Sequence, residues 1–218
     1  MTMILYKFKQ KFFKKYTRMK KGLFTILLLS FISCLSAQDI PLNAPTKTGG
    51  KPLLDAMNER QSNRSFEKKD LPAQTLSDLL WAANGFNRED KRVVPTSQNR
   101  QEMDVYVVFD TGIYLYNAKA NILKLIQKGD FRQALGQANI SENASLTLVY
   151  VADMSKASNR EAGFIDSGFI AQNVYLYCAS AGLGSVVRAS FQRPDLHKAM
   201  KLADNQEITI VQAIGYVK

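Results

Sequence analysis

The sequence is poor in cysteine and histidine, the residues that most often build disulfide frameworks, zinc sites and catalytic triads. Its 218 residues include two cysteines and one histidine. Cys34 lies in the N-terminal apolar run, so Cys178 is the one thiol of the remaining chain and no disulfide can form within it. His197 stands in a pattern typical of a surface helix, which argues against a histidine-centred triad.

Other chemical signatures are missing as well. The chain has no zinc-ligand spacing, no Gly-x-Ser-x-Gly elbow and no phosphate loop ending in Gly-Lys-Ser/Thr. If the protein is an enzyme, we therefore expect a bound cofactor to carry its chemistry.

Acidic residues are absent from the first 37 positions, and this explains the net charge of +10. That segment holds eight of the 29 basic residues, so 21 basic residues face 19 acidic ones in the rest of the chain. The body of the protein is nearly neutral and has no charge pattern typical of nucleic-acid binding.

The N-terminal segment has the parts of a secretory signal peptide. Lys20-Lys21 precede an apolar run that is shorter than the roughly 18 residues of a membrane-spanning helix, and small residues follow. We expect residues 1–37 to be a signal peptide cleaved after Ala37, and the protein to be exported, to the periplasm. An uncleaved membrane anchor and lipidation of Cys34 are the alternatives. Translation from Met19 would produce a signal of conventional length.

The pattern of apolar residues predicts a single α+β domain over residues 52–218, preceded by a linker or N-terminal arm over 38–51. Strands and helices do not alternate strictly, which disfavours a doubly wound parallel sheet. We predict helices at 52–60, 72–84, 119–127, 131–138 and 164–181, and strands at 103–109, 113–116, 146–152, 185–189 and 207–216. The helix at 164–181 is apolar nearly all round, so we expect it to be buried on most sides.

Three polar stretches are candidates for a binding site. Arg60 and Arg64, with the Ser62 hydroxyl between them, can converge on one phosphate. Each guanidinium group can donate two hydrogen bonds at once to phosphate oxygens. Amides and hydroxyls over 95–101 can bind the polar edge of a heterocycle, although an ordinary polar turn explains them equally well. After the long helix, Gly182 and Gly184 allow the backbone to approach a ligand closely; a simple glycine cap is the alternative.

In this order, the stretches resemble the FMN-dependent nitroreductase family. The resemblance extends over about 52–216, and within the family it is closer to the azoline-oxidising, SagB-type dehydrogenases. The motifs are Arg60-x-Ser62-x-Arg64-x-Phe66, Leu79-Leu80-Trp81-Ala82-Ala83-Asn84-Gly85, Pro95-x-Ser97, and Asp166-x-Gly168-x-x-x-Gln172-Asn173 leading to Gly182-Leu183-Gly184-Ser185.

The resemblance implies a nitroreductase-like mixed sheet flanked by helices, in an intertwined homodimer with two FMN sites at the subunit interface. By similarity, the FMN phosphate and ribityl chain would be held by Arg60, Gln61, Ser62 and Arg64, with Gln61 in place of the commoner second arginine. The isoalloxazine ring would be approached from the partner subunit by Pro95, Thr96, Ser97 and Asn99. The phosphate side would be lined by Gly182, Leu183 and Gly184, and Arg188 would replace the family's basic residue near the C-terminus.

The activity implied by the resemblance is hydride transfer through flavin N5 to an organic acceptor, such as a nitro compound or a quinone, by a ping-pong route. NAD(P)H is the family's usual electron donor; because it is scarce outside the cytosol, a membrane or redox-protein donor is the alternative for an exported protein. Two further alternatives are an exported flavin- or ligand-binding protein without turnover, and an FMN dehydrogenase or dehalogenase of a modified amino acid or peptide.

Overall fold

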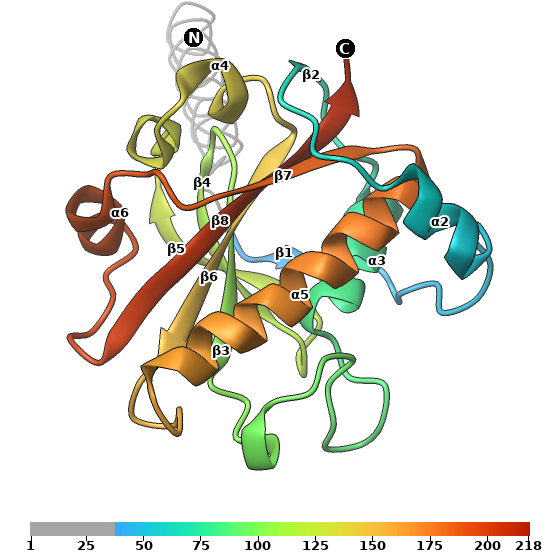
Figure 1. Ribbon diagram of the computed structural model, residues 1–218. Coiled ribbons are helices and arrows are strands. Elements are labelled where there is room, and N and C mark those ends of the chain that lie inside the picture. The colour runs from blue at the N-terminus through green and yellow to red at the C-terminus, as the bar shows by residue number, and fades with distance from the viewer. Residues whose placement is uncertain (1–37) are drawn as a thin grey trace, which may run out of the picture. The chain divides into compact units, whose positions relative to one another are not determined.

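The computed structural model describes residues 38–218, which form one antiparallel sheet with helices on both faces (Figure 1). The strand order is β1-β5-β4-β3-β6-β8-β2, and β7 also pairs with β8. The parallel component among these residues is one isolated bridge, between Ser62 and Ser185. The strands are β1 (Ile40–Pro41), β2 (Phe66–Glu67), β3 (Met103–Val108), β4 (Gly112–Asn117), β5 (Ile122–Lys128), β6 (Leu146–Asp153), β7 (Gly184–Arg188) and β8 (Gln206–Val217).

The helices divide between the two faces of the sheet. They are α2 (Leu53–Glu59), α3 (Ala73–Asn84), α4 (Ala138–Ser141), α5 (Arg160–Ala181) and α6 (Arg193–Ala199), with short 3-10 turns η1 (Ser97–Asn99) and η2 (Arg132–Leu135). Helices α3 and α5 pack on one face, and α6 with η2 covers the other. The predictions for residues 1–37, including the signal peptide, the cleavage site and Cys34, lie outside the described residues.

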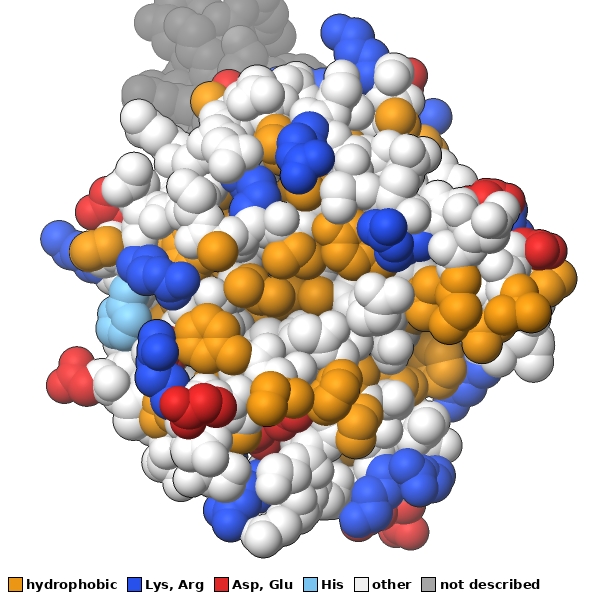
Figure 2. Space-filling view, viewed as in Figure 1, with side chains coloured by type: hydrophobic (Ala, Val, Ile, Leu, Met, Phe, Trp, Pro, Cys, Tyr) orange, Lys and Arg blue, Asp and Glu red, His pale blue; other side chains and the backbone are white. Residues whose placement is uncertain are grey.

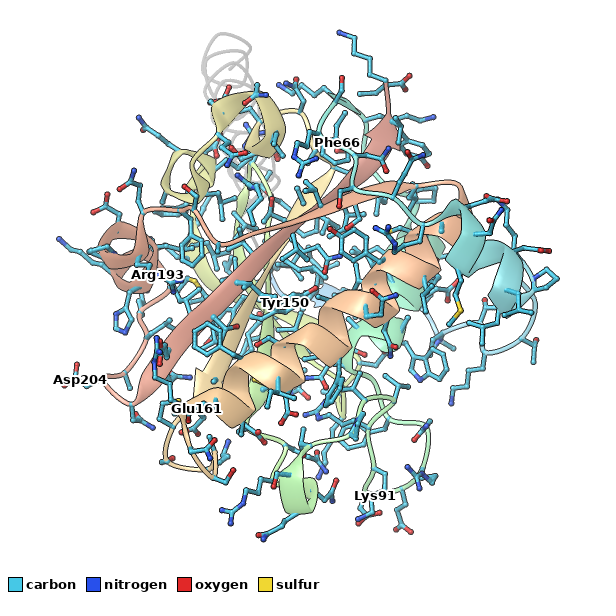
Figure 3. All side chains as sticks on the ribbon, viewed as in Figure 1. Phe66, Lys91, Tyr150, Glu161, Arg193 and Asp204 are labelled. Carbon is cyan, nitrogen blue, oxygen red and sulfur yellow. The ribbon has the colours of Figure 1, made fainter. Side chains whose placement is uncertain are left out.

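Strand β6 is buried on both faces because its side chains alternate between two cores. Leu148 and Tyr150 belong to the core beneath α3 and α5, whereas Val149 and Val151 belong to the core beneath α6. Tyr150 lies under α5 at the centre of the sheet (Figure 3). This explains why the strand reads as a continuous apolar run, and it confirms the predicted α+β class.

One predicted helix is wrong. The sequence predicts a helix over 119–127, but the chain forms β5 there. This strand pairs antiparallel with β4, so that Ile122 lies opposite Asn117 and Lys128 lies opposite Gly112. A stretch this short cannot hold a helix without tertiary support, and the edge of β4 supplies the alternative hydrogen bonds. The predicted helix at 131–138 is also replaced, by η2 and α4.

Part of the predicted arm is ordered against the domain. Within it, β1 pairs with β5, and the backbone N–H groups of Asn43 and Thr46 donate to Ser77 Oγ (2.9 Å) and Asp78 Oδ1 (2.7 Å) on α3. The arm therefore extends the sheet at its β5 edge.

Helix α5 is less buried in the single chain than its sequence predicts. Asn159 caps its start by accepting from the N–H of Ala162 (2.8 Å), and Gly182 ends it in the left-handed conformation. The inner side packs on the sheet, but Ile165 and Phe169 remain 58% and 42% exposed on the outer side. The outer face of α5 is thus an uncovered apolar surface.

Candidate functional site

The segment that follows α2 runs along strand β7. Ser62 forms the parallel bridge with Ser185, and the Asn63 N–H donates to the Ser185 carbonyl at 2.9 Å. Gly184 makes this approach possible, since a Cβ there would lie 2.5 Å from Val217 Cγ2 and 2.9 Å from Asn63 Cβ. In the single chain, the space that Gly184 leaves is therefore filled by neighbouring parts of the protein.

Tyr175 of α5 connects this segment to the strand, and sequence reasoning missed it. Its hydroxyl accepts the Val187 N–H at 2.8 Å and lies 3.1 Å from Ser62 Oγ. The guanidinium of Arg60 stands over the Tyr175 ring, 5.4 Å from its centroid. The one signal in the sequence was a tyrosine within the nearly apolar helix, two turns before the glycine pair.

A hollow of about 210 Å³ lies beside this contact. Gln61, Gly182 and Leu183 line it together with Asn63, Tyr175 and Val217, and the Lys51–Glu59 ion pair lies at its rim. The structure thus brings together three of the predicted site residues. Gly182 adds no clash here, because nothing lies within 4 Å of the position of its missing Cβ.

The two predicted arginines differ in burial. Arg60 is half-buried on Tyr175, and Arg64 is exposed. Because side chains alternate along an extended segment, Arg60, Ser62 and Arg64 share the side opposite to Gln61 and Asn63. This alternation would place both guanidinium groups on one edge, with the Ser62 hydroxyl between them.

The second predicted stretch lies at the other end of α5. The backbone N–H of Ser97 acts on the carboxyl group of Asp166, which is sixteen residues before Gly182 and hence about 24 Å away along the helix. Figure 1 shows this loop and the end of α5 beside α2 on opposite sides of the domain. One chain therefore does not bring Pro95, Thr96, Ser97 or Asn99 to Arg60.

The same stretch is tightly hydrogen-bonded and has an unusual backbone. Thr96 Oγ1 accepts the Gln101 N–H at 3.0 Å, and Asn99 Nδ2 donates to the Asp90 carbonyl at 3.2 Å. Gln98, Asn99 and Gln101 have φ of 53°, 55° and 51°. Left-handed backbone at residues other than glycine is uncommon and concentrates at functional sites.

Arg188 lies apart from the Arg60 edge and is 6% exposed. It follows Gly184 by four strand residues, about 13 Å, and its Nη1 donates to the carbonyls of Leu135 (3.1 Å) and Gly136 (2.9 Å). Burial lowers its pKa. Its Nε and Nη2 are buried and meet no acceptor among the described residues. A buried guanidinium with two free donors fits an oxygen-rich group that residues 38–218 do not provide.

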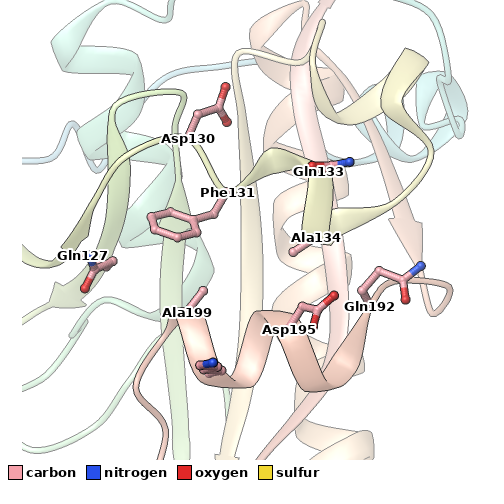
Figure 4. Close-up of a pocket in the computed structure, with 9 residues that line it drawn as sticks. Gln127, Asp130, Phe131, Gln133, Ala134, Gln192, Asp195 and Ala199 are labelled. Atoms are coloured by element: carbon pink, nitrogen blue, oxygen red, sulfur yellow. The ribbon is translucent and has the colours of Figure 1, made fainter.

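A larger hollow lies elsewhere, between η2 and α6 (Figure 4), and measures about 710 Å³. Phe131, Gln133, Asp195 and Lys198 are among its lining residues. It contains none of the predicted site residues, so we do not place the candidate site there. Among residues 38–218, no cluster of potential ligands is arranged to hold a metal ion, and no helix has the length and apolarity to cross a membrane.

Comparisons with known proteins agree on one family. The model of the nitroreductase family matches residues 57–216. A protein of Methanocaldococcus jannaschii named a nitroreductase is 25% identical over 169 residues, covering 70% of this chain and 85% of its own.

Solved structures show the same similarity. A crystal structure of a protein from Ralstonia eutropha JMP134, titled a nitroreductase, is 35% identical and superposes with a TM-score of 0.77 over 84% of this chain and 91% of that one. A chain of the Escherichia coli microcin synthetase McbBCD complex with truncated pro-MccB17 bound shares the fold. It has a TM-score of 0.66 and 20% identity, and the match covers 88% of this chain and 81% of that one.

Proposed function

This chain belongs to the nitroreductase family, and from that premise we propose that it is an FMN-dependent oxidoreductase that acts as a homodimer. The observation that carries the proposal is the edge formed by Arg60, Ser62 and Tyr175 beside the hollow of Gln61, Gly182 and Leu183. This edge offers cationic and hydroxyl groups to a phosphate. The backbone of Gly182, which lines the hollow, is accessible next to it.

The residues present fit FMN in two places. Arg60, Gln61, Ser62 and Arg64 would hold the phosphate and the ribityl chain, and the Gly182–Gly184 backbone would line the phosphate side. Arg188 would offer its two free donors to an oxygen atom of the cofactor, which would satisfy a buried charge that has no acceptor for them among the described residues.

The homodimer is supported by the uncovered apolar face. Leu53, Leu54 and Met57 on α2, with Ile165 and Phe169 on α5, are the large exposed apolar side chains of this side, and Figure 2 shows hydrophobic atoms over both helices. Gly168, near the middle of α5, has open space where its Cβ would lie. Such a surface on a soluble domain is typical of a protein interface.

Antiparallel packing of α5 against its copy would also complete the site. The Pro95–Asn99 loop lies about 24 Å from Gly182 in one chain, at the opposite end of the same helix. Reversing the partner's helix brings its loop to the Arg60 end. Pro95, Thr96, Ser97 and Asn99 would then contact the isoalloxazine ring from the partner subunit, as the resemblance implies.

The chemistry that FMN supplies when bound is the acceptance of a hydride and its delivery to an acceptor such as a quinone or nitro compound. Reduction of a quinone to a hydroquinone consumes that hydride equivalent and one proton. The chain's own residues would orient the two reactants in turn and hold positive charge where negative charge develops. We propose NAD(P)H as the donor in the cytosol and a membrane or redox-protein donor if the protein is exported.

We also propose that the protein is exported, because residues 20–37 have the pattern of a signal peptide. The N-terminal sequence of the protein isolated from cells tests it directly: a start at Gln38 supports cleavage, and retention of residues 1–37 indicates an anchor or an internal location.

The central experiment is spectroscopic. Protein reconstituted with FMN should be yellow after removal of free flavin, and NADH or NADPH should bleach it rapidly, with recovery when a quinone is added. If NADH and NADPH do not reduce the bound flavin, and no acceptor reoxidises it after reduction by dithionite, the protein binds flavin without catalysis. Failure to retain FMN would contradict the proposal.

A further inference from the structure

Two buried carboxyl groups meet under the loop that precedes β3. Asp166 is 4% exposed and Glu102 is 1% exposed. Both Glu102 oxygens and Asp166 Oδ2 lack a hydrogen-bond donor among the described residues, apart from each other. Two carboxylates this deeply buried cannot both carry a charge without a large desolvation cost, whereas one proton between them supplies the missing hydrogen bond.

Among residues 38–218, no cation is recorded as acting on Asp166. Besides Glu102, the one group that acts on Asp166 is the backbone N–H of Ser97 in η1. The charged side chains of neighbouring segments are engaged elsewhere. Arg100 donates to the Lys156 carbonyl, Lys156 pairs with Asp153, and Arg160 pairs with Glu207. Burial, the hydrogen bond to Glu102 and the Glu102 charge together raise the pKa of Asp166 to about 7.

The pair joins three parts of the fold at a strained place. Asp166 belongs to α5 and contacts Ser97, while Glu102 directly precedes β3 and its carbonyl accepts the Asp153 N–H at 2.9 Å. Between Ser97 and Glu102 lie the three left-handed residues Gln98, Asn99 and Gln101. A backbone of this kind persists only where its surroundings hold both ends in place.

We propose that a proton shared between Asp166 and Glu102 clamps the Ser97–Gln101 loop in its binding conformation, so that the pair acts as a positioning element and a pH-dependent switch for the flavin site. The flavin part of this inference rests on the proposed function, which assigns the loop to the isoalloxazine ring. Loss of the proton places two negative charges together, and their repulsion separates α5 from the loop.

The first test needs no flavin. Carbon-13 NMR of aspartate carboxyl groups in the apoprotein should show one group that titrates close to pH 7 and is missing in Asp166→Asn. Hydrogen exchange of residues 97–101, corrected for its intrinsic pH dependence, should lose protection as the pH rises above 7. In Asp166→Asn and Glu102→Gln, the permanent amide donor replaces the proton, so protection should stay constant.

The second test measures FMN affinity by fluorescence quenching between pH 6 and pH 8.5. We expect binding to the wild-type protein to weaken about fivefold more across this range than binding to either amide variant. Comparison with the variants cancels the titration of the FMN phosphate itself. Asp204→Asn, which removes an exposed carboxylate near β8, should behave like the wild type.

The outcomes separate the two proposals. If no variant binds FMN but the NMR and exchange results hold, the proposed function fails and the proton clamp stands. If every aspartate titrates below pH 5, or if exchange and affinity change with pH equally in wild type and both amide variants, the clamp is wrong. Should Asp166→Asn fail to fold, Glu102→Gln provides the same comparison.

Discussion

The Tyr175 hydroxyl lies 3.1 Å from Ser62 Oγ and ties the end of α5 to the segment that follows α2. The same oxygen accepts the Val187 N–H, so it is free to donate its hydrogen to Ser62. This small contact orients the predicted phosphate edge against β7.

Tyr175→Phe should therefore loosen the edge while leaving the fold intact. It leaves the Val187 N–H without its acceptor, which costs about 1 kcal/mol of stability, and FMN should bind about fivefold more weakly because Ser62 and Arg60 lose their orientation. Chemical denaturation and flavin titration measure the two effects. Tyr177→Phe, which loses its bond to the Thr75 carbonyl on the other side of α5, should change stability but not flavin affinity.

Arg60→Gln and Arg64→Gln should each weaken FMN binding by about tenfold or more, since hydrogen bonds to a charged phosphate contribute about 1.5–3 kcal/mol. Binding of riboflavin, which lacks the phosphate, should change little. The exposed Arg88→Gln is the matched control. Equal losses for FMN and riboflavin would argue against phosphate recognition by these arginines.

Phe169→Glu should prevent dimer formation, because it places a charge in the centre of the apolar face of α5. Light scattering after size exclusion should show a monomer, and FMN should be lost with the dimer because the partner's loop is then absent. Gln133→Glu, a change at an exposed position within η2, should leave the dimer unaffected. A dimeric Phe169→Glu protein would point to a different interface.

Gly184→Ala should destabilise the protein by about 1–3 kcal/mol, because a Cβ would clash with Val217 and Asn63. Adding Val217→Ala should recover part of the loss. The double-mutant cycle is read from denaturant midpoints; additive effects would show that the two side chains do not meet.

Asp166 should make the protein less stable as the pH rises. Its folded pKa of about 7 lies above its ordinary value of 3.8, so its contribution is fully present below pH 4 and is lost as the pH passes through 7. The loss is at most about 1.4 kcal/mol per pH unit. The free energy of unfolding of the wild type, minus that of Asp166→Asn, should fall between pH 4 and pH 7. Above pH 7 this difference should stay constant. A constant difference across this range would contradict the raised pKa.

Local patterns were sufficient for much of the fold. The helical spacing of Leu76, Leu79, Leu80 and Ala83 predicted α3, and the apolar run at 146–152 predicted the central strand β6, because both signals depend on neighbours in the chain. The order of the polar motifs likewise indicated the nitroreductase family, whose model matches residues 57–216.

Long-range contacts decided the rest. Residues 122–128 form a strand because β4 is there to pair with them, Ser62 pairs with Ser185 across more than a hundred residues, and Asp166 faces Glu102. Arg188 was buried away from the Arg60 edge by its place on β7. The sequence determines which chemical groups are present. How distant segments pack determines which of these groups are buried and paired, and therefore which charged groups lie in contact and which carboxyl groups stay protonated.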